Sequence, residues 1–257
     1  MPIGRFFVWT FPKSGDISLE DIMEKVKKAH YFTAAELALW MGSLALIVAA
    51  FCIWDRVNFL TLAASLLGVT SLIFCAKGNP AGQALIIVFA VLYGIISWKV
   101  AYYGEMITYV GMSAPMAVWA LVAWLRHPYR GKKSEVRVNE LRGREWALLV
   151  LITAAVTAAF YFILRALNTA NLIPSTVSVT TSFLAVYLTA RRSPFYALAY
   201  AANDGVLIVL WSLMAAEDIT CLSVVICFCV FFVNDLYGFF NWSRMRRRQR
   251  AGDGENS

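Results

Sequence analysis

Two pairs of adjacent polar residues interrupt long apolar stretches in the second half of the chain: Asn203-Asp204 and Asn234-Asp235. Ionisable side chains inside a hydrocarbon layer are costly, so those that occur there usually face a cavity or a partner. At a helical rise of about 1.5 Å per residue, both pairs lie roughly 12–15 Å deep from the same side of a membrane. We therefore expect the two pairs to meet near mid-membrane and to contact a ligand.

Aromatic and amide side chains extend these pairs along the same predicted helices and along a third. Amides and carboxylates form hydrogen bonds, while Trp and Tyr rings stack on flat groups and attract cations. This mixture suits a flat heterocycle that carries an amide, hydroxyl groups or a positive charge. The predicted substrate-binding residues are Asn203, Asn234, Asp235, Asp204, Gln83, Trp98, Tyr200, Trp211 and Tyr237.

The same residue types also have structural roles in membrane proteins. Trp and Tyr near the ends of a span usually form interfacial belts, which is the interpretation we prefer for Trp242, Trp124 and Tyr102. Amide side chains also join helices, and Gln83 fits either role. Glu105 lies close to the predicted outer surface, where it is either a gate residue or a solvated side chain.

Metal, cofactor and enzyme chemistry find little support. The five cysteines lie in apolar runs, and Cys227 and Cys229 face different directions on a helix because they are two residues apart. His30 and His127 both fall outside the predicted spans. No nucleophile–base pair is visible, so we expect no metal, no cofactor and no catalysis. A membrane-embedded transferase that uses the buried carboxylates is the weaker alternative.

The composition identifies the medium that surrounds these residues. Of the 257 residues, 60% are hydrophobic and 15% are charged, whereas a soluble domain has about half apolar and about a quarter charged residues. A membrane-spanning helix needs about 20 apolar residues. The sequence predicts eight spans, at 34–54, 57–76, 80–102, 104–125, 146–165, 171–190, 194–215 and 219–242.

The charged residues predict how the spans are oriented. The net charge of +7 gathers in the N-terminal segment, in residues 126–144 and in the C-terminal tail. Because basic loops stay on the cytoplasmic side, both termini are expected in the cytoplasm, and a nucleic-acid partner is not expected. The first 30 residues lack the apolar core of a cleavable signal, and residues 17–29 are expected to form an amphipathic helix on the membrane surface.

An internal repeat with an offset of 113–114 residues predicts the architecture. Residues 76–80 and 190–194 each combine a basic residue, a polar capping candidate and a proline that suits the first turn of a helix. We expect two parallel three-helix bundles joined by a linker helix, with a substrate site between them. The predicted parts are an amphipathic cytoplasmic segment (1–33), an extra transmembrane helix (34–54), the first repeat (57–125), a basic cytoplasmic loop with the linker helix (126–170), the second repeat (171–242) and a basic cytoplasmic tail (243–257).

Several extended segments resemble the PnuC-type family of bacterial vitamin transporters. These segments are 104–109 through Trp124 with Pro128-Tyr129, 201–204 with 206–211, and 233–242. The resemblance implies an enlarged relative of the sugar-exporting SWEET proteins, located in the bacterial cytoplasmic membrane. It also implies uptake of nicotinamide riboside by facilitated diffusion, with a cytoplasmic riboside kinase that traps the product. Thiamine and riboflavin remain alternative vitamin substrates, and a homo-oligomer remains open.

The chain departs from this family at one pattern. Members often have a Trp-x-x-Trp pair before the asparagine that corresponds to Asn203, whereas here those positions are Tyr196 and Ala199. Asn203 is retained, so a role in reading the amide of the substrate is carried over. We expect alternating access around a mid-membrane pocket, in which Asp204 or Asp235 neutralises the pyridinium charge or carries a coupled proton.

Overall fold

The computed structural model describes residues 31–169 and 171–254. The chain divides into two units, Met1–Leu37 and Ala38–Ser257. In the first unit, the Thr33 and Glu36 side chains each accept a hydrogen bond from the other's backbone N–H, at 3.2 and 2.7 Å, where a helix begins. The amphipathic helix predicted at 17–29 lies outside the described residues.

The described residues form an almost entirely helical protein. Eight helical segments are long and apolar enough to cross a membrane, which confirms the predicted class. The helices are α2 (Ala34–Ala50, continued by η1, Phe51–Asp55), α3 (Phe59–Ala76), α4 (Pro80–Lys99), α5 (Tyr103–Met106) followed by η2 (Ile107–Ser113) and α6 (Ala114–Arg126), α7 (Gly143–Ala166), α8 (Leu172–Ala190), α9 (Phe195–Ala215), and η3 (Ile219–Cys221) followed by α10 (Leu222–Gly254).

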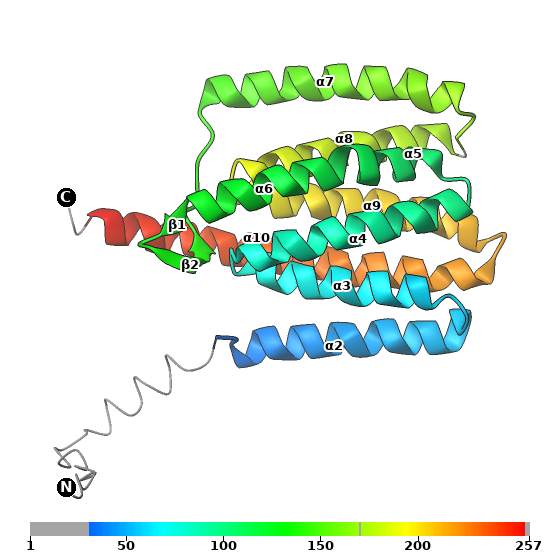
Figure 1. Ribbon diagram of the computed structural model, residues 1–257, viewed down its shortest axis with the longest axis horizontal. Helices are drawn as coiled ribbons and strands as arrows, with labels where there is room; N and C mark the ends of the chain where they lie inside the picture. The colour runs from blue at the N-terminus through cyan, green and yellow to red at the C-terminus, as the bar shows by residue number, and fades with distance from the viewer. Residues whose placement is uncertain (1–30, 170, 255–257) are drawn as a thin grey trace, which may run out of the picture. The chain divides into compact units, whose positions relative to one another are not determined.

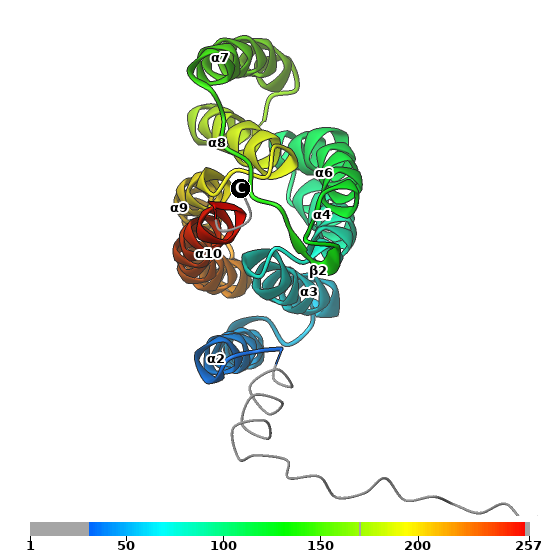
Figure 2. The same cartoon turned by 90° about the vertical axis from the view of Figure 1, so that its left-hand side faces the viewer.

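Six of these helices surround a common centre. Helices α3, α4 and α6 pack together, α8, α9 and α10 pack together, and the two groups meet where α3 contacts α10 and where α6 contacts α8. The end-on view in Figure 2 shows this ring, with α7 lying outside α8. Figure 1 shows the same helices from the side, running nearly parallel to one another.

Two turns that lie 114 residues apart in the chain have the same backbone structure. In the turns 77–79 and 191–193 the central residue has positive φ, 68° at Gly78 and 58° at Arg192. In each turn the second and third amides donate to carbonyls three and five residues earlier, at 2.8 and 3.0 Å in the first turn and 2.9 and 3.0 Å in the second. This is the pattern of a helix C-terminus closed by a left-handed residue.

The helices that follow these turns begin differently. Asn79 caps α4 by accepting a hydrogen bond from the Ala81 amide at 2.9 Å, with Pro80 in the first turn, as the sequence predicts. Helix α9 instead begins at Phe195, so Pro194 precedes its first residue and Ser193 does not cap it. The prediction that Ser193 caps this helix and that Pro194 is its first residue was wrong.

A β-hairpin, absent from the sequence prediction, lies between α6 and α7. Strand β1 (Pro128–Tyr129) pairs antiparallel with β2 (Lys132–Val136), and the turn residues Arg130 and Gly131 both have positive φ. Two central residues with positive φ give the turn a twist that matches paired strands. The hairpin sits beside the end of α10 in Figure 1.

Helix α10 continues past the predicted end of the last span to Gly254, where the sequence predicted a tail. This extension contacts the hairpin segment, residues 128–139. Gln249 donates to the Val136 carbonyl at 3.0 Å and accepts from the Val138 amide at 2.8 Å. The hairpin segment in turn bonds both turns: the Val136 amide donates to Gly78 and the Asn139 amide donates to Arg192, at 2.9 and 3.0 Å.

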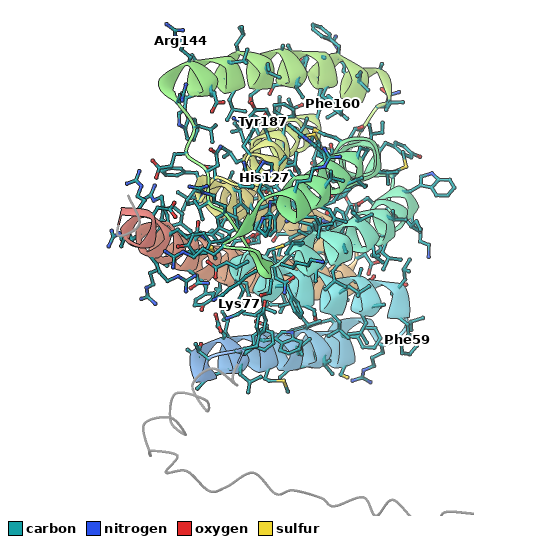
Figure 3. All side chains as sticks on the ribbon, turned by 60° about the vertical axis from the view of Figure 1, so that its left-hand side comes forward. Phe59, Lys77, His127, Arg144, Phe160 and Tyr187 are labelled. Carbon is teal, nitrogen blue, oxygen red and sulfur yellow. The ribbon has the colours of Figure 1, made fainter. Side chains whose placement is uncertain are left out.

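These contacts define one end of the helix ring, which we call the basic face: the turns 77–79 and 191–193, the hairpin segment 128–139 and the α10 extension 243–254. The helix ends at 55–59, 99–103 and 215–219 lie at the other end, which we call the opposite face. Figure 3 shows Lys77 and Phe59 at these two ends of α3.

Candidate substrate-binding site

A cavity of about 40 Å³ lies inside the ring of six helices. Helices α9 and α10 contribute the carboxyl groups of Asp204 and Asp235, and the π-helical turn η2 contributes Tyr109 and Ser113. Such turns within a helix are frequent at functional sites. The aromatic residues of the lining are Phe89, Tyr109, Tyr196, Tyr200, Phe228 and Phe231.

The two aspartates are the most polar feature of this cavity. Asp204 and Asp235 are 3% and 4% exposed, and both line this cavity. The Oδ2 atom of Asp204 receives no hydrogen bond from any donor among the described residues. The structure thus brings together the carboxylates of the two polar pairs.

Asn203 points elsewhere, although it is the neighbour of Asp204. Its Oδ1 accepts hydrogen bonds from three hydroxyls of α8, with Thr181 at 2.8 Å, Ser182 at 3.0 Å and Ser178 at 3.4 Å. Its Nδ2 donates to the Tyr109 hydroxyl at 3.4 Å. Asn203 therefore joins α8 to α9 and positions Tyr109, which lines the cavity.

Asn234 and Gln83 also lie outside the cavity lining. The Asn234 Nδ2 donates to Ser43 of α2 at 2.9 Å and to the Val230 carbonyl at 2.8 Å, so this side chain faces away from Asp235. Gln83 is fully buried and donates to the Cys75 sulfur at 3.3 Å. Gln83 thereby touches a residue of the lining without being part of it.

The remaining predicted residues occupy three different environments. Tyr200 lines the cavity, whereas Trp98 is 62% exposed in an apolar groove between α4 and η2. Tyr237 is half-buried on α10 and is not part of the cavity lining. Glu105 is fully buried near the opposite face, and neither of its carboxyl oxygens has a hydrogen-bond partner among the described residues.

A layer of aromatic residues lies between the cavity and the opposite face. Trp211 donates its indole N–H to the Tyr93 hydroxyl at 2.6 Å, which joins α9 to α4. The Tyr102 hydroxyl donates to the Leu210 carbonyl at 3.0 Å, and the rings of Tyr102 and Trp211 pack edge to face. We call Tyr93, Tyr102 and Trp211 the outer aromatic layer. Both of its hydrogen bonds cross between the two helix groups.

A second layer lies at the basic face. Trp124 of α6 donates to the Thr189 carbonyl of α8 at 2.9 Å, and Trp242 of α10 donates to the Cys75 carbonyl of α3 at 2.8 Å. The two indoles pack with centroids 5.3 Å apart, and Tyr196 packs edge to face on Trp242. We call Trp124, Trp242 and Tyr196 the inner aromatic layer.

The aromatic layers overturn one expectation from the sequence. The sequence favours interfacial belts for Trp124, Trp242 and Tyr102, but all three are at most 1% exposed and donate hydrogen bonds to buried carbonyls. A residue near the end of a span can belong either to an interfacial belt or to a buried aromatic layer, so its position in the sequence does not decide between these roles. Only the packing of the neighbouring helices distinguishes them.

A second, more polar hollow of about 170 Å³ lies beyond the outer aromatic layer, on the opposite face. Its lining includes Asp55, Asn58, Lys99, Trp211 and Asp218. Hydrogen bonds from the Thr220 hydroxyl and amide hold the pKa of Asp218 below its usual range. The hollow, which we call the vestibule, therefore keeps an ionised carboxylate at its rim.

Clusters of metal ligands and basic side chains are not found at the cavity among the described residues. Within residues 31–169 and 171–254, no three His, Cys, Asp or Glu side chains gather as ligands for a metal ion. The cavity lining contains no lysine, arginine or histidine among these residues. The arrangement can therefore hold a flat or cationic molecule between aromatic rings and carboxyl groups.

Comparison with known proteins gives a family model and two curated relatives that are named for the transport of nicotinamide compounds. A family model described as "Nicotinamide mononucleotide transporter" matches residues 58–244. The nicotinamide riboside transporter PnuC of Neisseria mucosa is 24% identical over 223 residues, which cover 85% of this chain and 83% of that protein. The protein of the same name from Haemophilus influenzae is 22% identical over 194 residues, covering 74% and 82%.

The fold has a counterpart among solved structures. A chain described as "Crystal structure of the Vitamin B3 transporter PnuC" matches with a TM-score of 0.76 at 22% identity, covering 90% of this chain and 99% of that chain. The family match includes all six helices of the ring, both aromatic layers and the cavity between them. The chain therefore belongs to the nicotinamide mononucleotide transporter family.

Proposed function

We propose that this protein imports nicotinamide riboside across the bacterial cytoplasmic membrane, by facilitated diffusion through alternating access. The observation that carries this proposal is the enclosed cavity in which Asp204 and Asp235 face a set of aromatic rings. Nicotinamide riboside is a flat pyridinium cation with an amide and ribose hydroxyls. Carboxylates stabilise its charge, and aromatic faces attract it. The names of the two curated relatives support the same substrate.

The charge of the cavity favours the riboside over the mononucleotide. A phosphate group would bring negative charge next to Asp204 and Asp235, and no cation of the described residues lines the cavity to offset it. Like charges in a site of low dielectric constant repel strongly. The unphosphorylated riboside removes this conflict, and a cytoplasmic kinase that phosphorylates it would then prevent its return.

The proposed binding residues act at different distances from the substrate. Asp204, Asp235 and Tyr200 contact it directly, since they line the cavity. Asn203 and Gln83 support Tyr109 and Cys75 of the lining, and become direct partners only if the helices rearrange. Asn234, Tyr237, Trp98 and Glu105 have no place in the lining of this closed state.

The transport cycle follows from the two aromatic layers. A cavity of about 40 Å³ holds a few water molecules, so the riboside enters only after one layer has separated. Each layer joins the helix group α3, α4, α6 to the group α8, α9, α10. We propose that the two groups are the parallel three-helix repeats and rock against each other, with α7 as the linker and α2 as an extra helix.

The membrane orientation is proposed from charge. The basic face carries the basic turns, the hairpin segment and the arginine-rich end of α10, so it is placed in the cytoplasm together with both termini. The vestibule then opens to the outside, where the substrate arrives. A distant relationship to SWEET proteins agrees with a pair of three-helix repeats.

Calorimetry with the detergent-purified protein tests the proposal. Nicotinamide riboside should bind saturably, thiamine and riboflavin should not, and Tyr200→Ala should weaken binding about tenfold or more by removing a contact ring. Trp119→Ala is the matched control, because Trp119 is exposed on α6 and lies outside every cavity described above. Binding of another vitamin in place of the riboside would replace the substrate and keep the fold.

A further inference from the structure

One charged side chain of the basic face has no counter-ion. Arg191 pairs with Glu145 at the start of α7. Arg137 of the hairpin segment pairs with Asp253 at 2.8 Å. None of the ion pairs formed by the described residues includes Arg192, whose Nη1 donates only to the Arg137 carbonyl at 3.5 Å. Three guanidinium groups therefore share two carboxylates, and one positive charge stays unbalanced.

Backbone hydrogen bonds hold these three arginines close together. The Asn139 side chain donates to the Arg191 carbonyl at 3.1 Å, and the Asn139 amide donates to the Arg192 carbonyl at 3.0 Å. The pKa of Arg192 lies below its ordinary value, because its guanidinium is partly buried and because Arg191 and Arg137 place positive charge nearby. An anion that binds among the three side chains would offset this repulsion.

The three guanidinium groups also retain unused hydrogen-bond donors. Each guanidinium carries several N–H donors in a fixed fork. Arg137 and Arg191 each use one terminal nitrogen in their ion pairs, and the Nε atom of Arg191 has no acceptor among the described residues. Arg192 is half-buried, so water solvates its charge only in part. Partly buried cations with unused donors are stabilised by a ligand that supplies acceptor oxygens.

Arg192 occupies a backbone position that favours glycine. Its φ is 58°, and the corresponding residue of the matching turn is Gly78, with a φ of 68°. A left-handed conformation costs free energy for a residue with a side chain, whereas glycine adopts it without that cost. Strained positions of this kind gather at functional sites. The turn itself therefore does not require an arginine, and the strain points to a role for the guanidinium.

We propose that Arg137, Arg191 and Arg192 form a binding site for a phosphate group. Phosphate oxygens accept paired hydrogen bonds from guanidinium groups, which match their geometry better than the point charge of a lysine. The phosphate belongs either to a phosphorylated solute or to the headgroup of an anionic phospholipid, since the site lies where the spans α8 and α9 end and begin. It is separate from the cavity lining and goes beyond the proposed transport function.

A bound phosphate links two parts of the basic face. Arg137 belongs to the hairpin segment, whereas Arg191 and Arg192 belong to the turn that leads into α9. Tyr196 of the inner aromatic layer lies in the first turn of that helix and packs on Trp242. Occupancy of the site should therefore hold the turn against the hairpin segment and keep the inner aromatic layer closed.

Thermal melting of the detergent-purified protein, stripped of lipid, measures phosphate binding. Inorganic phosphate is added at constant pH and constant ionic strength, with chloride as the balancing anion. The melting temperature should rise saturably with phosphate, because a ligand that binds only the folded state stabilises it. Hydrogen exchange at residues 137–139 and 191–193 should slow over the same range of phosphate concentration.

Two variants locate the site. Arg192→Gly removes the unpaired guanidinium and relieves the left-handed backbone, so it should fold at least as well as the wild type. Its affinity for phosphate should fall about tenfold or more, as expected for lost charge-assisted hydrogen bonds. Arg247→Ala is the matched control, because it removes one positive charge from an exposed position of α10 and should leave phosphate binding nearly unchanged. Equal weakening in both variants would mean that phosphate responds only to net charge, and would overturn the site.

A second measurement separates the two sources of the phosphate group. Native mass spectrometry compares the lipid retained by wild type and by Arg192→Gly after reconstitution in a mixture of phosphatidylglycerol and phosphatidylcholine. An additional phosphatidylglycerol on the wild type, without a response to inorganic phosphate, assigns the site to a lipid headgroup. A saturable phosphate response that Arg192→Gly loses assigns it to a phosphorylated solute. Absence of both effects overturns the site. None of these results depends on riboside binding, so the transport proposal is tested separately.

Discussion

Adjacent residues on a helix point about 100° apart, and the two Asn-Asp pairs show the effect of that angle. The sequence reveals that polar residues occur at matched depth on two helices, and the structure places one member of each pair in the cavity. Which member faces inward depends on how α9 and α10 are rotated about their axes. A single sequence with apolar residues on every side of the helix does not specify that rotation.

Asn203 is expected to matter more for stability than for direct contact with the substrate. Asn203→Ala leaves three hydroxyls of α8 and the Tyr109 hydroxyl without their common partner, which should cost about 1–3 kcal/mol. The melting temperature in detergent should fall clearly. Ser182→Ala removes only one of these bonds and should produce a smaller shift. Unchanged stability together with lost binding would instead assign Asn203 to the substrate.

Gln249 provides a test at the scale of secondary-structure elements. Its buried amide makes hydrogen bonds with Val136 and Val138, so Gln249→Ala should release the hairpin segment from α10 at a cost of about 1–3 kcal/mol. Hydrogen exchange at residues 128–139 should accelerate. Arg247→Ala, at an exposed position of the same helix, is the control and should leave that exchange rate unchanged.

The spans were predictable, whereas the elements at the basic face were not. Length and apolar content place the helix ends to within a few residues, except for the end of α10, because a bilayer demands a minimum apolar length. The hairpin and the extension of α10 are polar, so apolar content cannot indicate them. Helix α10 continues because its last turns have partners in the hairpin segment, and that pairing is a long-range contact. The π-helical turn η2 likewise has no signature in composition.

At the scale of the whole molecule, Cys75 can report which aromatic layer has opened. It is a free, buried thiol that lines the cavity. With the other four cysteines replaced, Trp242→Phe should speed modification of Cys75 by a charged thiol reagent applied at the basic face, since the variant loses the hydrogen bond to the Cys75 carbonyl. Trp211→Phe should do so from the opposite face, because it loses the bond to Tyr93.

The test in that experiment is whether each variant speeds the modification of Cys75 from one side of the membrane only. Equal acceleration from both sides in either variant would contradict separate layers. Val110→Ala on the outer surface of η2 is the control, since Val110 lines only the apolar groove that contains Trp98.

The vestibule predicts a dependence of uptake on ionic strength. Asp218 stays ionised because Thr220 stabilises its carboxylate, so it should attract a cation toward the outer aromatic layer. Asp218→Asn should lower the initial uptake rate a few-fold at low salt and have little effect at high salt, where the charge is screened. Glu217→Gln, an exposed carboxylate outside the vestibule lining, is the comparison. A salt-independent loss would indicate a structural defect instead.

The inner aromatic layer has a consequence for the ancestry of the protein. Trp124 of α6 donates to the Thr189 carbonyl at the end of α8, which belongs to the other helix group. In the reverse direction, Trp242 of α10 donates to the Cys75 carbonyl at the end of α3. The two acceptors, Cys75 and Thr189, stand 114 residues apart, each in the last turn of the helix that precedes one of the two matching turns. A protein with only one group would leave its indole without an acceptor, whereas two copies related by a twofold axis would make both bonds as one self-complementary contact. We infer that the two helix groups descend from such a pair, joined in one polypeptide by α7.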